Sequence, residues 1–221
     1  MHSANFLGKQ LDTEYGLYLP EYHVPSPVAK TNFINVIGKN GSIDKSSPDG
    51  VIYYEDREWG LEFRKTGPNV SGYDLPGISR SICNDLHGRR GEFIFDDDPE
   101  WKWVGRIFVD DVNCEENGLI IATIRLITDP FRYKLENISR SFDLSSTAQT
   151  ITLTNGVKPI IPTIIVSDTA SLEFTIKGET FTATFSTGTW RTADLVLFEG
   201  NTEISISGSG TITFEYPEAS L

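Results

Sequence analysis

The sequence predicts a mainly β protein with two domains: an N-terminal β-sandwich or barrel-like domain with one short helix, and a C-terminal antiparallel β-sandwich. Apolar and polar residues alternate with a period of two in many short runs. Turn-forming residues separate these runs, and only one segment has helical spacing. The length of 221 residues suits one large domain or two modest ones and is enough to bury a core.

In the first domain, six runs read as strands because they are rich in β-branched and aromatic residues. They are residues 33–37, 51–54, 59–63, 92–95, 103–109 and 119–126. A helix is predicted over about residues 76–88, because Ile78, Ile82 and Leu86 recur at a spacing of four and Gly88 follows the last of them.

The domain boundary is predicted near Asp129-Pro130, where an apolar strand gives way to a polar segment, so that the domains span residues 1–134 and 135–221. The second domain shows the clearest alternation, with turn signals such as Asn155-Gly156 and Lys177-Gly178 between its strands. Its predicted strands centre on residues 151–153, 164–166, 172–176, 181–185, 195–197, 204–206 and 212–216.

The stretch FDDDPEWKW, residues 95–103, has the composition of either an ion site or a turn. Its unbroken acidic run lacks the spacing and central glycine of a calcium-binding loop, and adjacent carboxylates point in different directions. Asp and Pro favour turns, so we expect a solvated hairpin corner without a metal. Trp101 and Trp103 then lie on one strand face and serve packing or a subunit interface.

The sequence contains only weak indications of catalytic residues. Cys83 and His87 lie four residues apart on the predicted helix, but no third residue that would orient them is evident. With 31 acidic residues, some carboxylate pair will match glycosidase spacing by chance, so a β-sandwich glycosidase is the least favoured alternative. We expect a protein that is not an enzyme and binds no cofactor.

The net charge of −12 is shared equally between the predicted domains, and no basic stripe is present. This distribution argues against specific nucleic-acid binding and against anionic membranes. The N-terminus lacks the pattern of a signal peptide, and no apolar run is long enough for membrane insertion, so we expect cytoplasmic synthesis. Two cysteines make neither a disulfide framework nor a zinc site.

Two long segments and their order resemble the distal tail proteins of long-tailed, siphovirus-type bacteriophages or prophages. INVIGKNGSIDKSSPDGVIYYEDREWGLEF, residues 34–63, is similar to the family's N-terminal signature of a strand, a G-x-x-G turn and a second strand. The elements of this signature are Gly38, Gly41, Ile43-Asp44, Tyr53-Tyr54 and Asp56-Arg57. The run from residue 155 to residue 216 resembles the family's galectin-like sandwich, and the resemblance covers nearly the whole chain.

The resemblance implies a structural virion protein, made in the cytoplasm of the bacterial host, that forms a hexameric ring at the distal end of the tail tube. Its implied partners are further copies of itself, the tail tube protein, a tail-tip or tail-associated protein and receptor-binding proteins of the baseplate. Candidate interface residues combine the signature with the aromatic strand. They are Gly38, Gly41, Ile43, Asp44, Tyr54, Arg57, Trp101 and Trp103.

The alternative is a glycan-binding β-sandwich adhesin that contacts the host surface, with Trp190 and Arg191 as candidate sugar contacts. The galectin sugar-binding signature is absent, however, because Trp190 is followed by Arg-Thr-Ala. This departure argues against lectin activity in the sandwich.

Overall fold

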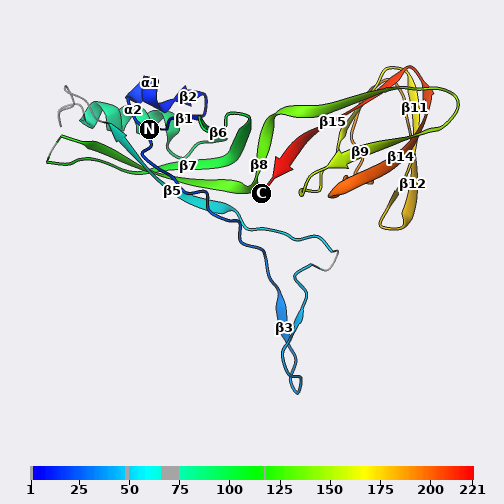
Figure 1. Cartoon of the computed structure of the whole chain (residues 1–221), viewed down its shortest axis with the longest axis horizontal. Helices are drawn as coiled ribbons and strands as arrows, with labels where there is room; N and C mark the ends of the chain where they lie inside the picture. Colours follow the sequence, from blue (N-terminus) through cyan, green and yellow to red (C-terminus); the bar gives the residue numbers. More distant parts are fainter. Residues whose placement is uncertain (1, 48–49, 66–74, 117) are drawn as a thin grey trace. The chain divides into compact units, whose positions relative to one another are not determined.

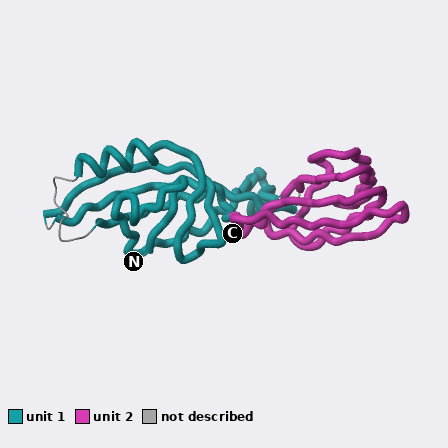
Figure 2. Tube along the Cα trace, turned by 90° about the horizontal axis from the view of Figure 1, so that it is seen from above, with its two compact units in different colours: residues 1–132, 221 teal, residues 133–220 magenta. Residues whose placement is uncertain are grey.

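The computed structural model describes residues 2–47, 50–65, 75–116 and 118–221. The chain divides into two compact units, residues 1–132 with 221 and residues 133–220 (Figure 2). The sequence boundary was placed two residues later, after residue 134. The fold is mainly β, as predicted, and the described residues include no helix long and apolar enough to cross a membrane.

The described residues of unit 1 form two helices and the first strands of the chain (Figure 1). Its elements are β1 (Ala4–Phe6), β2 (Lys9–Gln10), α1 (Leu11–Tyr15), β3 (Phe33–Asn35), β4 (Ser42–Asp44), β5 (Arg57–Lys65), α2 (Leu75–Leu86), β6 (Arg90–Phe95), β7 (Trp101–Cys114) and the first part of β8 (Ile120–Asp143). The strand order is β5-β8-β7-β6-β1-β2, with β3 and β4 as a separate hairpin. The one predicted helix, about residues 76–88, is confirmed as α2, whereas the short helix α1 was not predicted.

The sheet of unit 1 curls around an aromatic core. β5 and β8 pair in antiparallel register over nine residue pairs, and β5 alternates buried and exposed residues along its length. Phe6 from β1 packs edge to face against Phe63 from β5, with ring centroids 5.7 Å apart, although these strands lie far apart in the strand order. The first domain is therefore barrel-like, as the sequence predicts.

Unit 2 is an antiparallel sandwich. Its elements are the last part of β8, β9 (Gln149–Asn155), β10 (Thr163–Val166), β11 (Thr169–Ile176), β12 (Glu179–Phe185), β13 (Gly188–Trp190), β14 (Gly200–Ser209) and β15 (Thr211–Ser220). One sheet has the order β13-β10-β15-β8 and the other β12-β11-β14-β9. Most apolar side chains of the alternating runs are buried, as Ile204 and Phe214 are, whereas Ile176, Phe181 and Ala183 are half-buried.

Several predicted elements differ from the structure. The runs 51–54 and 195–197 are not strands, because each pairs only through one isolated bridge, at Tyr54 and at Leu197. The polar segment after Asp129 does not end its strand, since β8 continues through Pro130 to Asp143. Pro130 lies two residues beyond Thr128, the last residue of β8 paired with β5, so its missing N–H interrupts no bond of that ladder.

A hydrogen bond ties the two helices of unit 1 together. The Tyr15 hydroxyl donates to Asp85 Oδ2 at 2.7 Å. Burial, with Asp85 as a second cause, raises the pKa of Tyr15 well above its usual range, and the same hydrogen bond lowers the pKa of Asp85. A carboxyl whose folded pKa is depressed contributes stability above its unfolded pKa, which is about 3.9, and loses it as the pH falls through the folded pKa.

Tyr15→Phe should therefore lower the free energy of unfolding most at neutral pH. Between pH 7 and pH 2, urea titrations should show the gap between Tyr15→Phe and the unchanged chain narrowing below about pH 4. A gap of constant size across this range would contradict the assignment of the Asp85 pKa shift to the Tyr15 hydroxyl.

Candidate functional site

The segment between the core strands of unit 1 is an extended β-arm, defined here as described residues 24–47 and 50–56 (Figure 1, around the label β3). β3 and β4 pair antiparallel at its tip, with Ile34 opposite Ile43. The predicted G-x-x-G turn joins them, and Gly38 and Gly41 have φ values of 84° and 76°. Such positive φ values favour glycine, so these two residues set the geometry of the tip.

The arm is held as a ribbon by backbone bonds rather than by a core. Nearer the base, the amide of Lys30 donates to the carbonyl of Tyr53, and that of Glu55 donates to the carbonyl of Val28. Near the tip, the amide and hydroxyl of Ser46 donate to Asp44 and lower the pKa of its carboxyl. Every residue from 31 to 42 is exposed.

The arm carries most of the large exposed apolar side chains of the described residues, eight of twelve. They are Val24, Val28, Phe33, Ile34, Val36, Ile37, Ile52 and Tyr53. Phe33 is 57% exposed and Ile37 is fully exposed, at 105% of its reference area. Soluble monomers seldom gather apolar side chains on one exposed element, and such patches mark interaction sites.

A buried arginine anchors the base of the arm. Arg57 is 4% exposed. Its Nη1 donates to the carbonyl of Pro25 at 2.6 Å and its Nε to that of Pro130 at 2.7 Å. The guanidinium stacks over the Trp103 ring, 4.8 Å from its centroid. One side chain thus connects the first residues of the arm, the strand that follows it and β8.

A second arginine extends this stack. Arg132 lies 4.6 Å from the centroid of the Trp101 ring and donates to Asp98 Oδ2 at 2.7 Å. Burial, and then the charge of Arg132, lower the pKa of Arg57. Arg57 Nη2 and Arg132 Nε are buried and have no acceptor among the described residues. The Arg-Trp stack is therefore a tightly packed cationic cluster at the arm base.

We expect Arg57→Lys to loosen the base of the arm. Lysine cannot form the two-pronged contact with Pro25 and Pro130 or stack on Trp103, so unit 1 should lose about 2 kcal/mol of stability. Hydrogen exchange at the amides of Lys30 and Glu55 should accelerate. The matched control is Arg64→Lys on the same strand, because Arg64 is exposed and pairs with Glu62. Equal effects of the two changes would contradict the anchoring role of Arg57.

The acidic corner is a hairpin turn, as predicted. β6 and β7 pair antiparallel on either side of it. Its carboxylates diverge: Asp98 contacts Arg132, Asp97 lies 3.4 Å from His2 Nδ1, and Asp96 accepts from Gln10. Among the described residues, no group of three or more His, Cys, Asp or Glu side chains is arranged to hold a metal ion.

The predicted interface residues separate into two groups. Gly38, Gly41 and Asp44 are exposed on the arm, and Ile43 and Tyr54 are half-buried there, with Tyr54 packed edge to face on Phe131. Arg57 and Trp103 are buried within the protomer, so they have almost no surface to offer a neighbour, and Trp101 is half-buried beside them. Sequence reasoning missed Arg132 and the exposure of Phe33, Ile34, Val36 and Ile37.

The side chains of the two candidate glycan contacts, Trp190 and Arg191, already form contacts within the protomer. Trp190 is 39% exposed, but its indole N–H donates to the Ser186 carbonyl and its ring packs against Phe185. Arg191 donates to the Ile161 carbonyl.

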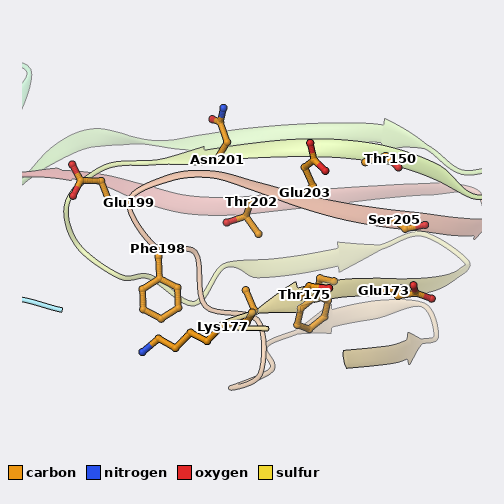
Figure 3. A pocket seen from close by; sticks show the side chains of 12 residues that line it. Thr150, Glu173, Thr175, Lys177, Phe198, Glu199, Asn201, Thr202, Glu203 and Ser205 are labelled. Carbon is orange, nitrogen blue, oxygen red and sulfur yellow. The ribbon is translucent and has the colours of Figure 1, made fainter. Parts of the chain in front are cut away.

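A separate hollow of about 570 Å³ lies elsewhere on the sandwich (Figure 3). Its lining includes hydroxyl side chains, three glutamates and Phe198, but neither Trp190 nor Arg191. The Lys177 ammonium already lies against the Phe198 ring, 4.9 Å from its centroid.

No family model matches this chain, and no curated protein sequence does. Among solved structures, the chain is similar to the crystal structure of the Dit protein of SPP1, described as a paradigm of the hub adsorption apparatus in phages that infect Gram-positive bacteria. The two share 16% sequence identity and a TM-score of 0.72, over 100% of both chains. The phage P2 baseplate in its activated conformation with Ca matches with 8% identity and a TM-score of 0.43, over 100% of this chain and 99% of that one. The first match establishes a shared fold and agrees with the resemblance found in the sequence.

Proposed function

We propose that this chain is a non-enzymatic virion protein of a bacteriophage or prophage, a distal tail protein that forms a hexameric ring at the end of the tail tube. In this role it serves as the hub that carries baseplate and receptor-binding proteins. The main support for the proposal is the exposure of the apolar side chains of the arm, which an interface with another protein would bury. The fold shared with the SPP1 Dit protein supports it.

Burial of the arm supplies the driving force for assembly. Complete burial of one large apolar side chain contributes about 1.5–3 kcal/mol. Four of the exposed residues at the tip, Phe33, Ile34, Val36 and Ile37, are 43–105% exposed. Covering this tip alone is worth on the order of 5 kcal/mol per arm before the entropic costs of association.

Charge favours another copy of the chain as the partner. Residues 30–45 contain three lysines and one aspartate, a net charge of +2, so the rest of the chain carries −12 − 2 = −14. The outer part of the arm, residues 30–45, is therefore basic and apolar and complements the acidic remainder of a neighbour, whereas Glu55 and Asp56 near the base bring the described arm as a whole to a net charge of 0. Donor and acceptor surfaces differ, and such head-to-tail contacts close into a ring when the rotation between copies permits.

The other partners follow from the same role. A ring at the tube end contacts the tail tube protein on one side and a tail-tip or tail-associated protein on the other, and the sandwich units carry receptor-binding proteins. Six copies hold a formal charge of 6 × −12 = −72, which disfavours specific contacts with the passing genome.

Electron microscopy of the purified chain tests the proposal. The expected particles have a central opening and six-fold rotational symmetry. Two-fold dimers without an opening would refute the ring, and solitary particles that bind a saccharide would favour the adhesin alternative instead.

A further inference from the structure

Unit 2 contains a groove of about 700 Å³ that no part of the proposed ring uses. Its lining comes from the last part of β8, from β9 with the turn that follows it, and from β15. Ile138 and Phe142 supply half-buried apolar surface, and Phe142 also packs against the core ring of Phe214. Both β8 and β9 end the strand order of their sheets within this unit. The groove therefore lies where two sheet edges meet.

The β9 edge presents unused backbone groups. The Tyr216 hydroxyl donates to the Thr154 carbonyl at 2.9 Å, so this carbonyl points away from β14, the one strand that pairs with β9. Backbone groups of alternate residues in a strand point to the same side. The amide and carbonyl of Thr150 and Thr152 thus also point outward, and no strand of the described residues pairs with β9 on that side. An extended chain can add to such an edge.

The groove also carries an exposed positive charge. Arg140 is exposed at its lining and forms no ion pair among the described residues, and the one acidic residue of the lining, Glu218, is already paired with Lys134 at 3.0 Å. Asn155 is 6% exposed, and its Oδ1 has no donor in the described structure while its Nδ2 donates to two carbonyls. A buried acceptor without a donor costs stability, so Asn155 is a strained point in the wall of the groove rather than a contact for a ligand.

We propose that this groove binds an extended polypeptide segment of another protein, which adds as a strand to β9 and places a carboxylate on Arg140. The backbone edge selects a peptide, and the uncompensated guanidinium selects an acidic one. The arm of a second copy does not fit, because residues 30–45 carry a net charge of +2 and Arg140 repels them. The inference goes beyond the ring and assigns one docking surface for an attached protein.

The experiment uses two blocked octapeptides of alternating threonine and valine, one with a central aspartate and one with a central lysine. NMR of the full chain should show the aspartate peptide shifting the amide signals of Thr150 and Thr152 and slowing their hydrogen exchange. The lysine peptide should bind about tenfold more weakly. Arg140→Glu should reverse this preference, whereas Arg191→Glu, the same charge change outside the groove, should leave it intact.

Thr152→Pro tests the strand addition itself. The Thr152 amide makes no ladder bond to β14, so proline removes the outward donor and leaves the β9–β14 pairing in place. It should abolish binding of both peptides, while Thr152→Val should not. Unchanged Thr150 and Thr152 signals, or binding that ignores Arg140→Glu or survives Thr152→Pro, would overturn the proposal. Peptide binding is measured independently of ring assembly. The peptide-binding groove and the proposed ring can therefore be refuted separately.

Discussion

Replacement of Phe33, Ile34, Val36 and Ile37 by serine is expected to leave the chain folded and to abolish its assembly. These side chains are exposed in the protomer, so their loss removes little from its stability. At an interface, the four changes remove on the order of 5 kcal/mol per arm, which weakens each contact by about three orders of magnitude or more. Sedimentation should show a single 24.6 kDa species.

The matched control for the arm tip uses exposed apolar residues elsewhere. Leu135→Ser and Val157→Ser change side chains that are 42% and 37% exposed in unit 2. They should leave assembly intact. If the arm variant still assembles like the unchanged chain, the arm does not form the subunit interface, and the proposed ring loses its main physical support.

Gly105→Ala is expected to produce the largest loss of stability of any single change considered. A Cβ at Gly105 would lie 2.2 Å from the Ile127 carbonyl oxygen and 2.5 Å from Thr128 Cα, both in the backbone of β8. Backbone cannot rotate away as a flexible side chain can, so β7 and β8 would have to separate. The expected cost is about 3–5 kcal/mol, close to the total stability of a marginal domain.

Gly60→Ala is the control for this change, because Gly60 lies in β5 of the same sheet and nothing stands within 4 Å of its added Cβ. Alanine there should be neutral or stabilising by about 0.5 kcal/mol. Thermal unfolding of the two variants should separate them by more than 10 °C, since about 1 kcal/mol shifts a domain of this size by roughly 4 °C. Equal melting temperatures would contradict the close approach of β7 and β8.

Alternation of apolar residues was sufficient to predict the strands with one buried face. Residues 59–63 are an example, because burial and pattern coincide along β5. At the arm, composition predicted a strand over residues 33–37 and β3 covers Phe33–Asn35, but the adjacent side chains of Phe33 and Ile34, which point to opposite faces, are both exposed. Periodicity reports which side chains share a face and does not report what covers that face.

The burial of Arg57 at the base of the arm could not be predicted from the sequence for a different reason. Arginine is rarely buried, so a pattern-based reading places Arg57 on the surface. Its burial depends on the carbonyls of Pro25 and Pro130 and on the ring of Trp103, which are distant in the sequence and converge only in the fold. Likewise, no local signal shows that Gly105 lies against the backbone of β8.

The most direct test of the central claim, that this protein functions by self-association through its arm, is the mass of the purified chain under native conditions at high concentration. We expect a dominant species of six copies, 6 × 24.6 kDa or about 148 kDa, which dissociates to 24.6 kDa monomers when the arm tip is changed to serine. A 24.6 kDa monomer at every concentration, with or without the arm changes, would contradict that claim.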